Sequence, residues 1–258
     1  MAFLYLSSGD HKNADMHPRI KAYKTDSGAV VAQLRIFTNG PVLGMQSHKA
    51  LSEDHAIALS WMKYLQNQDE ALLIQLRLQK VVSQAIDLIE GFLLKKRKVK
   101  LKGAVLAGQS KRGHLAWLSA SRDQRIAGVI PMVFDLLNLR VNMQHHFKVY
   151  GHWAKALAPY EEYGILHRIN DVEFAALTQV VDPFCFSDKV KVPKYIINAA
   201  NDEYFLPDSS QHYFDGLKGP KALCYLPNHG HRLEDCGQAY WDDVFAAFQL
   251  ISRVFTGP

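Results

Sequence analysis

The sequence predicts an α/β fold, a mostly parallel β-sheet with helices on both faces. Short, nearly continuous apolar segments alternate with longer amphipathic ones, and strands of that composition belong to sheets buried on both faces. Reactive polar residues directly follow several apolar segments, as expected for loops at the carboxyl ends of parallel strands. The chain has 258 residues, with no internal repeat or linker-like segment, so we expect residues 1–258 to form one domain.

The first quarter of the chain predicts two strands and one well-defined helix. Residues 2–8 are short, apolar and aromatic and end in a turn, which is typical of a strand. Residues 17–28 suit a short helix or an irregular crossover, and residues 29–37 read as a buried strand that ends at Asn-Gly-Pro. Residues 52–66 predict a helix, because Ser52 is a favourable N-cap and two acidic residues follow it in the first turn.

The middle of the chain predicts two helices and two strands. Residues 70–96 have helical periodicity throughout and a basic end, which the helix dipole favours. Residues 103–107 are a small, apolar strand, and residues 112–121 predict the helix that follows it. Residues 126–134 are a second apolar strand.

The last part repeats the alternation after a long insertion. Residues 136–183 are rich in His, Tyr, Phe and Trp with helix-like patches, and we expect them to form a helical, aromatic lid over the sheet. Residues 194–200 and 222–227 predict strands, residues 209–217 a short helix, and residues 238–255 a closing amphipathic helix.

Charge, cysteines and hydropathy narrow the classes of function. The net charge is +5, and the basic run at residues 95–102 reads as the solvated end of a helix, without interleaved aromatic residues that would stack on bases. We therefore expect no nucleic-acid partner. Cys185, Cys224 and Cys236 form neither a disulfide framework nor a metal motif. No apolar stretch approaches the roughly 20 residues of a membrane span. The first ten residues lack signal-peptide features and resemble a strand, so we expect the chain to begin inside the fold.

Three residues with the chemistry of a catalytic triad each follow a predicted strand. Ser110 lies in "GAVLAGQSKRGHLAWLSA" where the strand at 103–107 gives way to a helix, Asp202 follows the strand at 194–200, and His231 follows the last strand. This chain order of serine, acid and histidine is that of α/β-hydrolases. A serine hydroxyl needs a neutral imidazole to take its proton, and a carboxylate fixes the imidazole tautomer. The sequence therefore predicts a serine hydrolase that needs no cofactor.

The turn around Ser110 departs from the usual G-x-S-x-G pattern. Gly108 precedes the serine by two residues, but Arg112 occupies the second position after it and Gly113 the third. Small residues are needed where a tight turn from strand to helix is crowded. The backbone N–H of Lys111 is the first predicted oxyanion donor, and the loop at Ser8 and Gly9 is the candidate for the second.

Several assignments stay open at this stage. Asp135 ends the strand at 126–134 and is the alternative acid, unless it is a cap or binds backbone amides of the lid. His229 is a weaker candidate than His231, which follows a glycine, and Asp208 is expected to cap the helix at 209–217. The Lys111 side chain could stabilise an oxyanion or bind a substrate carboxylate, or leave the site to pair with acids of a helix or the lid.

A histidine-rich segment of the lid does not predict a metal site. His145, His146 and His152 lack carboxylate partners at ligand spacing, and adjacent histidines on a helix point in different directions. We expect no metal here. Nearby aromatic residues are candidates for the wall of a substrate pocket, with core packing as the alternative: Phe147, Tyr150, Trp153 and Tyr160.

Long stretches of the chain resemble a known family. They are "TNGPVLG", "SEDHAIALSWMKYL", "AGQSKRGHLAWLSASRDQRIAGVIPMVFDLLN" and "VVDPFCFSDKVKVPKYIINAANDEYFLPDSSQHYFDGLKGPKALCYLPNHGH". The chain resembles the PhoPQ-activated pathogenicity-related protein family, which is α/β-hydrolase-like. The resemblance implies Ser110 as nucleophile, Asp202 as acid and His231 as base, and it suggests an exported protein.

The same resemblance sets two further expectations. Family members are typically longer at both ends, so the chain is expected to lack the first strands of the fold. Some relatives are secreted regulators, so an inactive binding or signalling protein is the alternative to an esterase; a peptidase or amidase is less expected than an esterase. The basic residue Lys111 directly after Ser110 also resembles the nucleophile motif of glucuronoyl esterases, in which a basic residue follows the serine. This resemblance suggests a small-molecule or glycan ester, conceivably anionic, as substrate.

Overall fold

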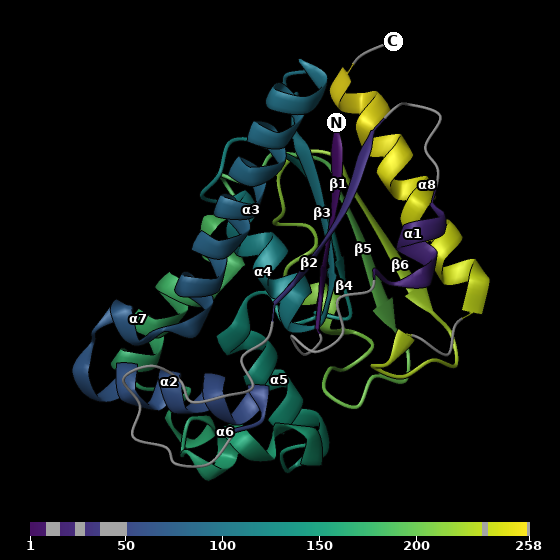
Figure 1. Ribbon diagram of the computed structural model, residues 1–258. Helices are drawn as coiled ribbons and strands as arrows, with labels where there is room; N and C mark the ends of the chain where they lie inside the picture. Colours follow the sequence, from purple (N-terminus) through teal and green to yellow (C-terminus); the bar gives the residue numbers. More distant parts are fainter. Residues whose placement is uncertain (9–15, 24–28, 37–50, 234–236, 257–258) are drawn as a thin grey trace.

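The described residues form a single parallel sheet. The computed structural model describes residues 1–8, 16–23, 29–36, 51–233 and 237–256 (Figure 1). Its six strands are hydrogen-bonded in the order β2-β1-β3-β4-β5-β6, and every neighbouring pair is parallel. Their bounds are β1 (Ala2–Ser7), β2 (Val30–Arg35), β3 (Ala104–Gln109), β4 (Ile126–Met132), β5 (Lys194–Ala199) and β6 (Lys221–Leu226).

Helices cover both faces of the sheet, as the apolar strands predict. The helices α3 (Ile74–Arg97) and α4 (Lys111–Ala120) lie on one face, and α1 (Pro18–Ala22) and α8 (Gly237–Thr256) lie on the other (Figure 1). Alternate strand residues point to the two faces. Leu4 and Leu106 therefore join the apolar cluster under α3 and α4, whereas Phe3 and Val105 join the cluster under α8.

A layer of helices lies at the carboxyl ends of the strands (Figure 1). Its members between β4 and β5 are α5 (Leu139–Tyr150), α6 (Ala158–Glu162) and α7 (Val172–Val181), with the short 3-10 helices η2 (Lys155–Leu157), η3 (Leu166–Arg168) and η4 (Pro183–Phe186). The helix α2 (Glu53–Asn67) packs among them and shares one apolar cluster with them. Two separate segments of the chain therefore build this layer, which we call the cap.

Three local expectations are corrected by the structure. The segment at 70–96 is not one helix: a 3-10 turn, η1 (Glu70–Leu72), precedes α3, and the extended, fully buried Leu73 lies between them and packs into the cap. The strand β2 is half-buried rather than buried, because it is the edge of the sheet. The helix expected at residues 209–217 is only the short 3-10 helix η5 (Ser209–His212), less than half as long as expected.

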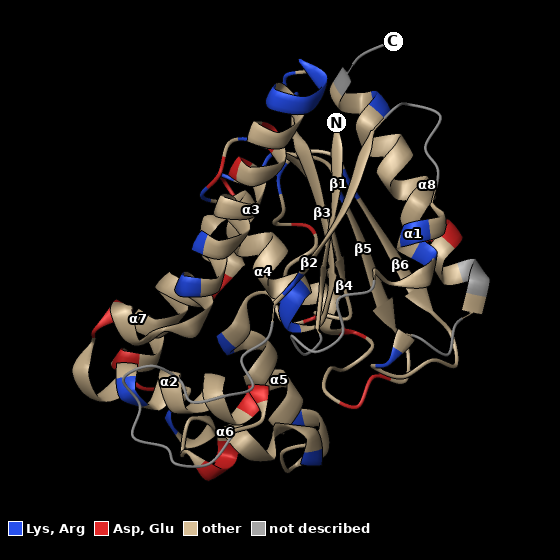
Figure 2. Cartoon of the chain, viewed as in Figure 1, with Lys and Arg blue, Asp and Glu red and all other residues tan. Residues whose placement is uncertain are grey.

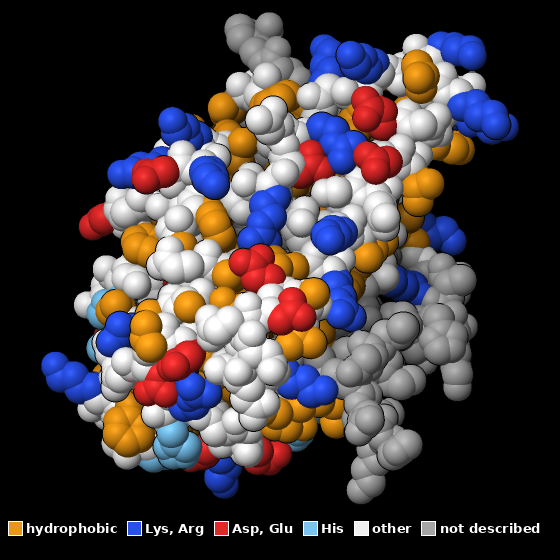
Figure 3. Space-filling view, turned by 90° about the vertical axis from the view of Figure 1, so that its left-hand side faces the viewer, with side chains coloured by type: hydrophobic (Ala, Val, Ile, Leu, Met, Phe, Trp, Pro, Cys, Tyr) orange, Lys and Arg blue, Asp and Glu red, His pale blue; other side chains and the backbone are white. Residues whose placement is uncertain are grey.

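The long basic run lies far from the carboxyl ends of the strands (Figure 2). The basic run begins at the exposed end of α3, which Figure 2 shows at the opposite end of the molecule from α6. On the face in Figure 3, basic and acidic side chains are interspersed. Among the described residues no helix is long and apolar enough to cross a membrane. Cys185 and Cys224 are free thiols, and Cys236 lies outside the described residues.

Candidate active site

Ser110 occupies a strained backbone conformation on the turn between β3 and α4. Its φ is 54° and its ψ is −124°, a backbone conformation that residues other than glycine rarely adopt. The Ser110 N–H donates to the Met132 carbonyl of β4 at 2.7 Å, and the His114 N–H donates to the Ser110 carbonyl at 3.0 Å. The turn is therefore held on both sides, and such strain persists only where the surroundings fix it.

Two glycines make this turn sterically possible. A Cβ atom at Gly108 would lie 2.7 Å from the Arg112 Cβ and 2.8 Å from the Arg112 carbonyl carbon. A Cβ at Gly113 would lie 3.0 Å from the Gly108 oxygen and 3.2 Å from the Met132 backbone. The departure from G-x-S-x-G therefore has a simple reason: Arg112 packs against Gly108, and the second glycine is needed where α4 crosses β4.

The structure brings Ser110, His231 and Asp202 together. The His231 Nε2 lies 2.8 Å from the Ser110 Oγ, and the His231 Nδ1 lies 2.8 Å from the Asp202 Oδ2. Asp202 follows β5 and its side chain is only 3% exposed, while His231 follows β6. The Asp202 Oδ1 accepts from the backbone N–H of Tyr204 at 2.8 Å, which orients the carboxylate toward the imidazole.

A second carboxylate holds the histidine loop. The Glu203 Oε2 accepts from the His231 backbone N–H at 2.9 Å. Burial raises the pKa of Glu203, but hydrogen bonds from the backbone N–H groups of His231 and of Glu203 itself, with smaller contributions from nearby positive charges, more than offset it, so the pKa is lowered overall. Sequence reasoning missed Glu203. The signal was available, because Glu203 directly follows Asp202 in the loop after β5 and both side chains are carboxylates.

The competing residues lie in other environments. The Asp135 carboxylate is buried and accepts from the hydroxyls of Tyr213, at 2.6 Å, and Tyr225. Within the described part of the chain it neither caps a helix nor binds backbone amides of the cap. His229 is exposed, and its Nδ1 lies 2.7 Å from the Pro227 carbonyl. Asp208 is the N-cap residue of η5, as expected, but its carboxylate makes no capping hydrogen bond; it pairs with His145 and accepts from the Gln211 side chain.

Of the predicted oxyanion donors, Lys111 and Ser8 lie close to the Ser110 turn. Lys111 is the first residue of α4, so its N–H is one of those that a helix cannot pair internally. The end of β1 lies beside this turn, since Leu6 of β1 is in register with Gly108 of β3. Ser8 and Ser110 line the same opening, and Gly9 lies outside the described residues.

The two cations after Ser110 are paired with two acids of α2. The Lys111 ammonium lies 3.0 and 2.9 Å from the two Asp54 carboxylate oxygens. The Arg112 guanidinium pairs with Glu53 and donates to the Ile36 carbonyl at 2.6 Å. Of the alternatives for the Lys111 side chain, the structure therefore shows pairing with acids of a helix. Sequence reasoning assigned these acids only to the helix dipole, since nothing local links residues so far apart.

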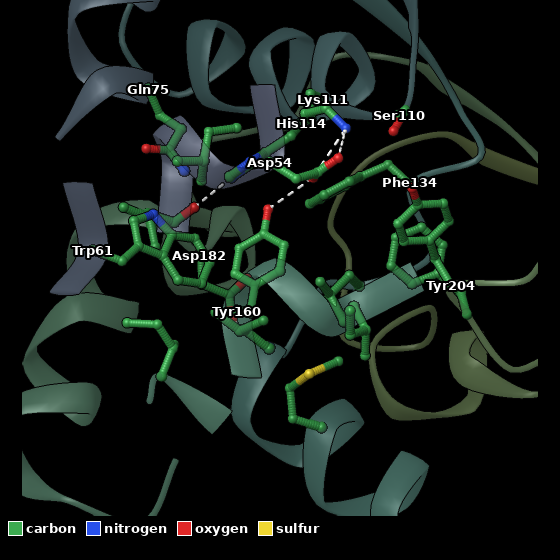
Figure 4. A pocket seen from close by; sticks show the side chains of 18 of the residues that line it. Asp54, Trp61, Gln75, Ser110, Lys111, His114, Phe134, Tyr160, Asp182 and Tyr204 are labelled. Atoms are coloured by element: carbon green, nitrogen blue, oxygen red, sulfur yellow. Dashed lines mark hydrogen bonds and ion pairs between the residues drawn. The ribbon is translucent and has the colours of Figure 1, made fainter. Parts of the chain in front are cut away.

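A narrow cavity leads from Ser110 into the cap (Figure 4). Most of its walls are apolar, and the Tyr160 hydroxyl, which donates to Asp54 at 3.2 Å, lines it too. His114 forms part of the wall; its ring stacks on Phe134 at 4.5 Å, and its Nε2 lies 2.6 Å from the Val181 carbonyl. Burial lowers the pKa of His114 to about 4, so this side chain is neutral near pH 7.

Of the four lid aromatics predicted as wall candidates, only Tyr160 lines this cavity; Phe147, Tyr150 and Trp153 do not. Phe147 and Tyr150 are 45% and 46% exposed, and Trp153 stacks against His146. Within the part of the chain that the structure describes, no group of three or more His, Cys, Asp or Glu side chains could hold a metal ion.

Comparisons with known proteins agree with this architecture. The sequence model of the family described as PhoPQ-activated pathogenicity-related protein matches residues 2–258. The Autocrine proliferation repressor protein A of Dictyostelium discoideum is 33% identical over 238 residues, which are 90% of this chain; the chain spans 48% of that protein's length.

Solved structures of acetyl xylan esterases have the same fold. The enzyme from Paenibacillus sp. R4 superposes with a TM-score of 0.66 at 15% identity, over 97% of this chain and 73% of its own. Acetyl xylan esterase 1 from Thermoanaerobacterium sp. JW/SL YS485 superposes with a TM-score of 0.62, also at 15% identity, over 97% of this chain and 74% of its own. The predicted fold class, α/β-hydrolase-like with a mostly parallel sheet, is confirmed.

Proposed function

The chain belongs to the PhoPQ-activated pathogenicity-related protein family, and we propose that it is a serine hydrolase that cleaves an ester through an acyl-enzyme. One observation carries the proposal: Ser110, His231 and Asp202 form an unbroken chain of two 2.8 Å contacts at the carboxyl ends of three strands. Proton transfer requires heavy atoms at about this separation.

The proposed reaction follows from the positions of these atoms. The His231 Nε2 takes the Ser110 hydroxyl proton as the oxygen attacks the ester carbonyl, and the Asp202 carboxylate holds the other ring nitrogen as N–H. The imidazolium then returns the proton to the leaving alcohol, which leaves an acyl group on Ser110. A water molecule, deprotonated by His231, hydrolyses the acyl-enzyme and restores the serine hydroxyl.

The backbone around Ser110 supports the charged intermediate. The Lys111 N–H at the start of α4, together with the loop that begins at Ser8 and continues to Gly9, would donate hydrogen bonds to the oxyanion. The strained φ of Ser110 supports this role, since it exposes the side chain above the turn.

The segment at residues 136–183 would act as a lid. Its helices lie over the carboxyl ends of the strands together with α2, and the Tyr160–Asp54–Lys111 contacts join this cap to the turn at Ser110. A lid of this kind excludes water from the acyl group and shapes the substrate pocket. We expect one domain, with the lid as an insertion in it.

The expected substrates are esters of small molecules or of glycans. The likeness to acetyl xylan esterases concerns the fold, and it favours an ester over an amide as a starting point for assays. The cavity at Ser110 is consistent with a short acyl group.

A second candidate function is a binding or signalling protein with an unreactive triad. The relative from Dictyostelium discoideum is named as a repressor of proliferation, and that name favours a regulatory role.

Labelling with a fluorophosphonate separates the two functions. Wild-type protein is expected to label stoichiometrically on Ser110, and Ser110→Ala to lose both labelling and hydrolysis of p-nitrophenyl acetate, by roughly 10³-fold or more. A matched control is Ser121→Ala, whose hydroxyl donates to the Leu118 carbonyl at the end of α4. A folded wild-type protein that neither labels nor hydrolyses any ester would support the regulatory role.

A further inference from the structure

Three polar atoms deep in the cavity lack a partner among the described residues. They are both amide atoms of Gln75, at the start of α3, and the indole nitrogen of Trp61, on α2. The two side chains are only 5% and 7% exposed. Both line the cavity that Ser110 also lines, and Figure 4 shows them on the side of it away from Ser110.

Unpaired polar atoms at such depth lower the stability of a protein. A buried amide without hydrogen bonds costs more than an apolar side chain of the same shape would. The neighbouring Gln79, one turn further along α3, shows the ordinary arrangement: its amide donates to the Ser83 hydroxyl at 3.1 Å. The unsatisfied Gln75 is therefore expected to have a ligand.

The size of the cavity indicates which part of a substrate enters it. Its volume is about 70 Å³, which is room for only a few water-sized groups. On its other side Ser110 faces a far wider space of about 720 Å³, whose walls include the polar side chains of Ser8, Gln33 and Arg35. A slender acyl chain fits the first cavity, and a bulky alcohol fits the second.

The charges around the cavity disfavour an anionic acyl group. The Lys111 ammonium is paired with Asp54, and His114 is neutral near pH 7. Asp182, a buried carboxyl on the wall, accepts backbone hydrogen bonds from Leu139 and Phe184, and burial raises its pKa to about 6. A substrate carboxylate would lose its hydration here and gain no counter-ion.

We propose, building on the proposed hydrolase function, that Gln75 and Trp61 select an ester whose slender acyl chain ends in an uncharged group able to both accept and donate hydrogen bonds. A carboxamide or a hydroxyl meets this description. Its oxygen accepts from the Gln75 amide nitrogen and the Trp61 indole N–H, and its own hydrogen is donated to the Gln75 amide oxygen. Between that group and the ester carbonyl the chain is apolar, as the walls of the cavity are.

Three p-nitrophenyl esters of equal shape test this assignment. Their acyl groups are adipamoyl, which ends in a carboxamide, 6-methylheptanoyl, its hydrocarbon isostere, and the adipate monoanion, its charged isostere. Wild-type protein is expected to hydrolyse the carboxamide ester with a kcat/KM roughly 10- to 100-fold above that of either isostere, because only this ester satisfies the buried amide.

The matched variants are Gln75→Leu and Gln79→Leu, which change two glutamines one turn apart on the same helix. Gln75→Leu is expected to reverse the preference between the carboxamide and hydrocarbon esters and to raise the melting temperature, since it removes an unpaired buried amide. Gln79→Leu is expected to leave the preference as in wild type, because Gln79 already has a partner in Ser83.

The outcomes for this inference and for the proposed function differ. A protein that labels with fluorophosphonate but shows no preference for the carboxamide ester, or keeps the preference in Gln75→Leu, overturns the assignment of Gln75 and leaves the hydrolase in place. A preference for the adipate monoanion overturns it too. A folded protein without labelling or hydrolysis overturns both.

Discussion

Two carboxylates near the site differ in their hydrogen bonds, and this difference sets the first prediction. Asp202 contacts the His231 imidazole, whereas Asp135 accepts from two tyrosine hydroxyls. Asp202→Asn is expected to lower kcat/KM for p-nitrophenyl acetate by roughly 10³- to 10⁴-fold, because the imidazole loses its tautomer control and its counter-charge. Asp135→Asn is expected to keep most of the activity. The reverse pattern would make Asp135 the acid.

The buried Asp135 also predicts how stability depends on pH. Burial raises its pKa from 3.8 to about 7, despite hydrogen bonds from two tyrosines that lower it. Between about pH 4 and pH 7 the folded state keeps a proton that the unfolded state loses, so this group makes stability fall as the pH rises.

Urea unfolding at pH 4.5 and at pH 7.5 measures that effect. Over this interval the free energy of unfolding of the wild type is expected to fall by up to about 3 kcal/mol more than that of Asp135→Asn, at about 1.4 kcal/mol per pH unit between pH 4.5 and pH 7. Equal losses in the two proteins would show that Asp135 does not titrate in this range.

At the scale of single elements, the turn from β3 to α4 has little room for change. A Cβ at Gly108 would lie 2.7 Å from the Arg112 Cβ, and Arg112 cannot retreat easily because it is paired with Glu53 and bonded to the Ile36 carbonyl. Gly108→Ala is expected to lower the free energy of unfolding by about 1–3 kcal/mol and to lower activity, since it displaces the Ser110 backbone.

A glycine elsewhere provides the control for that change. A Cβ at Gly91, on the exposed side of α3, would contact nothing within 4 Å. Gly91→Ala is expected to raise the free energy of unfolding by up to about 1 kcal/mol, because alanine favours a helix. Chemical denaturation of both variants checks the pair, and a Gly108→Ala protein as stable and active as wild type would mean that the turn is less crowded than it looks.

At the scale of the whole molecule, the cap and the sheet share side chains. Leu136 and Tyr204 pack against both the cap cluster and the cluster under α4. The cap and the sheet are therefore expected to unfold together, in one cooperative transition.

Tryptophan positions make this prediction testable. Trp61 and Trp153 belong to the cap, and Trp117 and Trp241 to the two sides of the sheet. In the double variant Trp117→Phe/Trp241→Phe, urea unfolding followed by fluorescence reports on the cap, and far-ultraviolet circular dichroism reports on the whole chain. Coincident midpoints are expected. An earlier fluorescence transition would make the cap a separate unit.

The sequence by itself determined the strands, the loops that follow their carboxyl ends and the residues of those loops that meet at Ser110. Parallel strands end at a common edge, so polar residues that follow them, such as Asp202 and His231, converge whatever the details of packing. The glycines around Ser110 were readable for the same local reason, since a tight turn needs small residues.

Only the tertiary structure decided which charges pair and which polar groups stay unpaired. Glu53 and Asp54 are nearly sixty residues from Arg112 and Lys111, and no local preference links them. Gln75 stands four residues before Gln79 on the buried side of α3, a spacing visible in the sequence, yet only packing leaves one of them satisfied and the other not. Local sequence fixes backbone preferences, whereas the partners of a side chain depend on distant segments that meet when the chain folds.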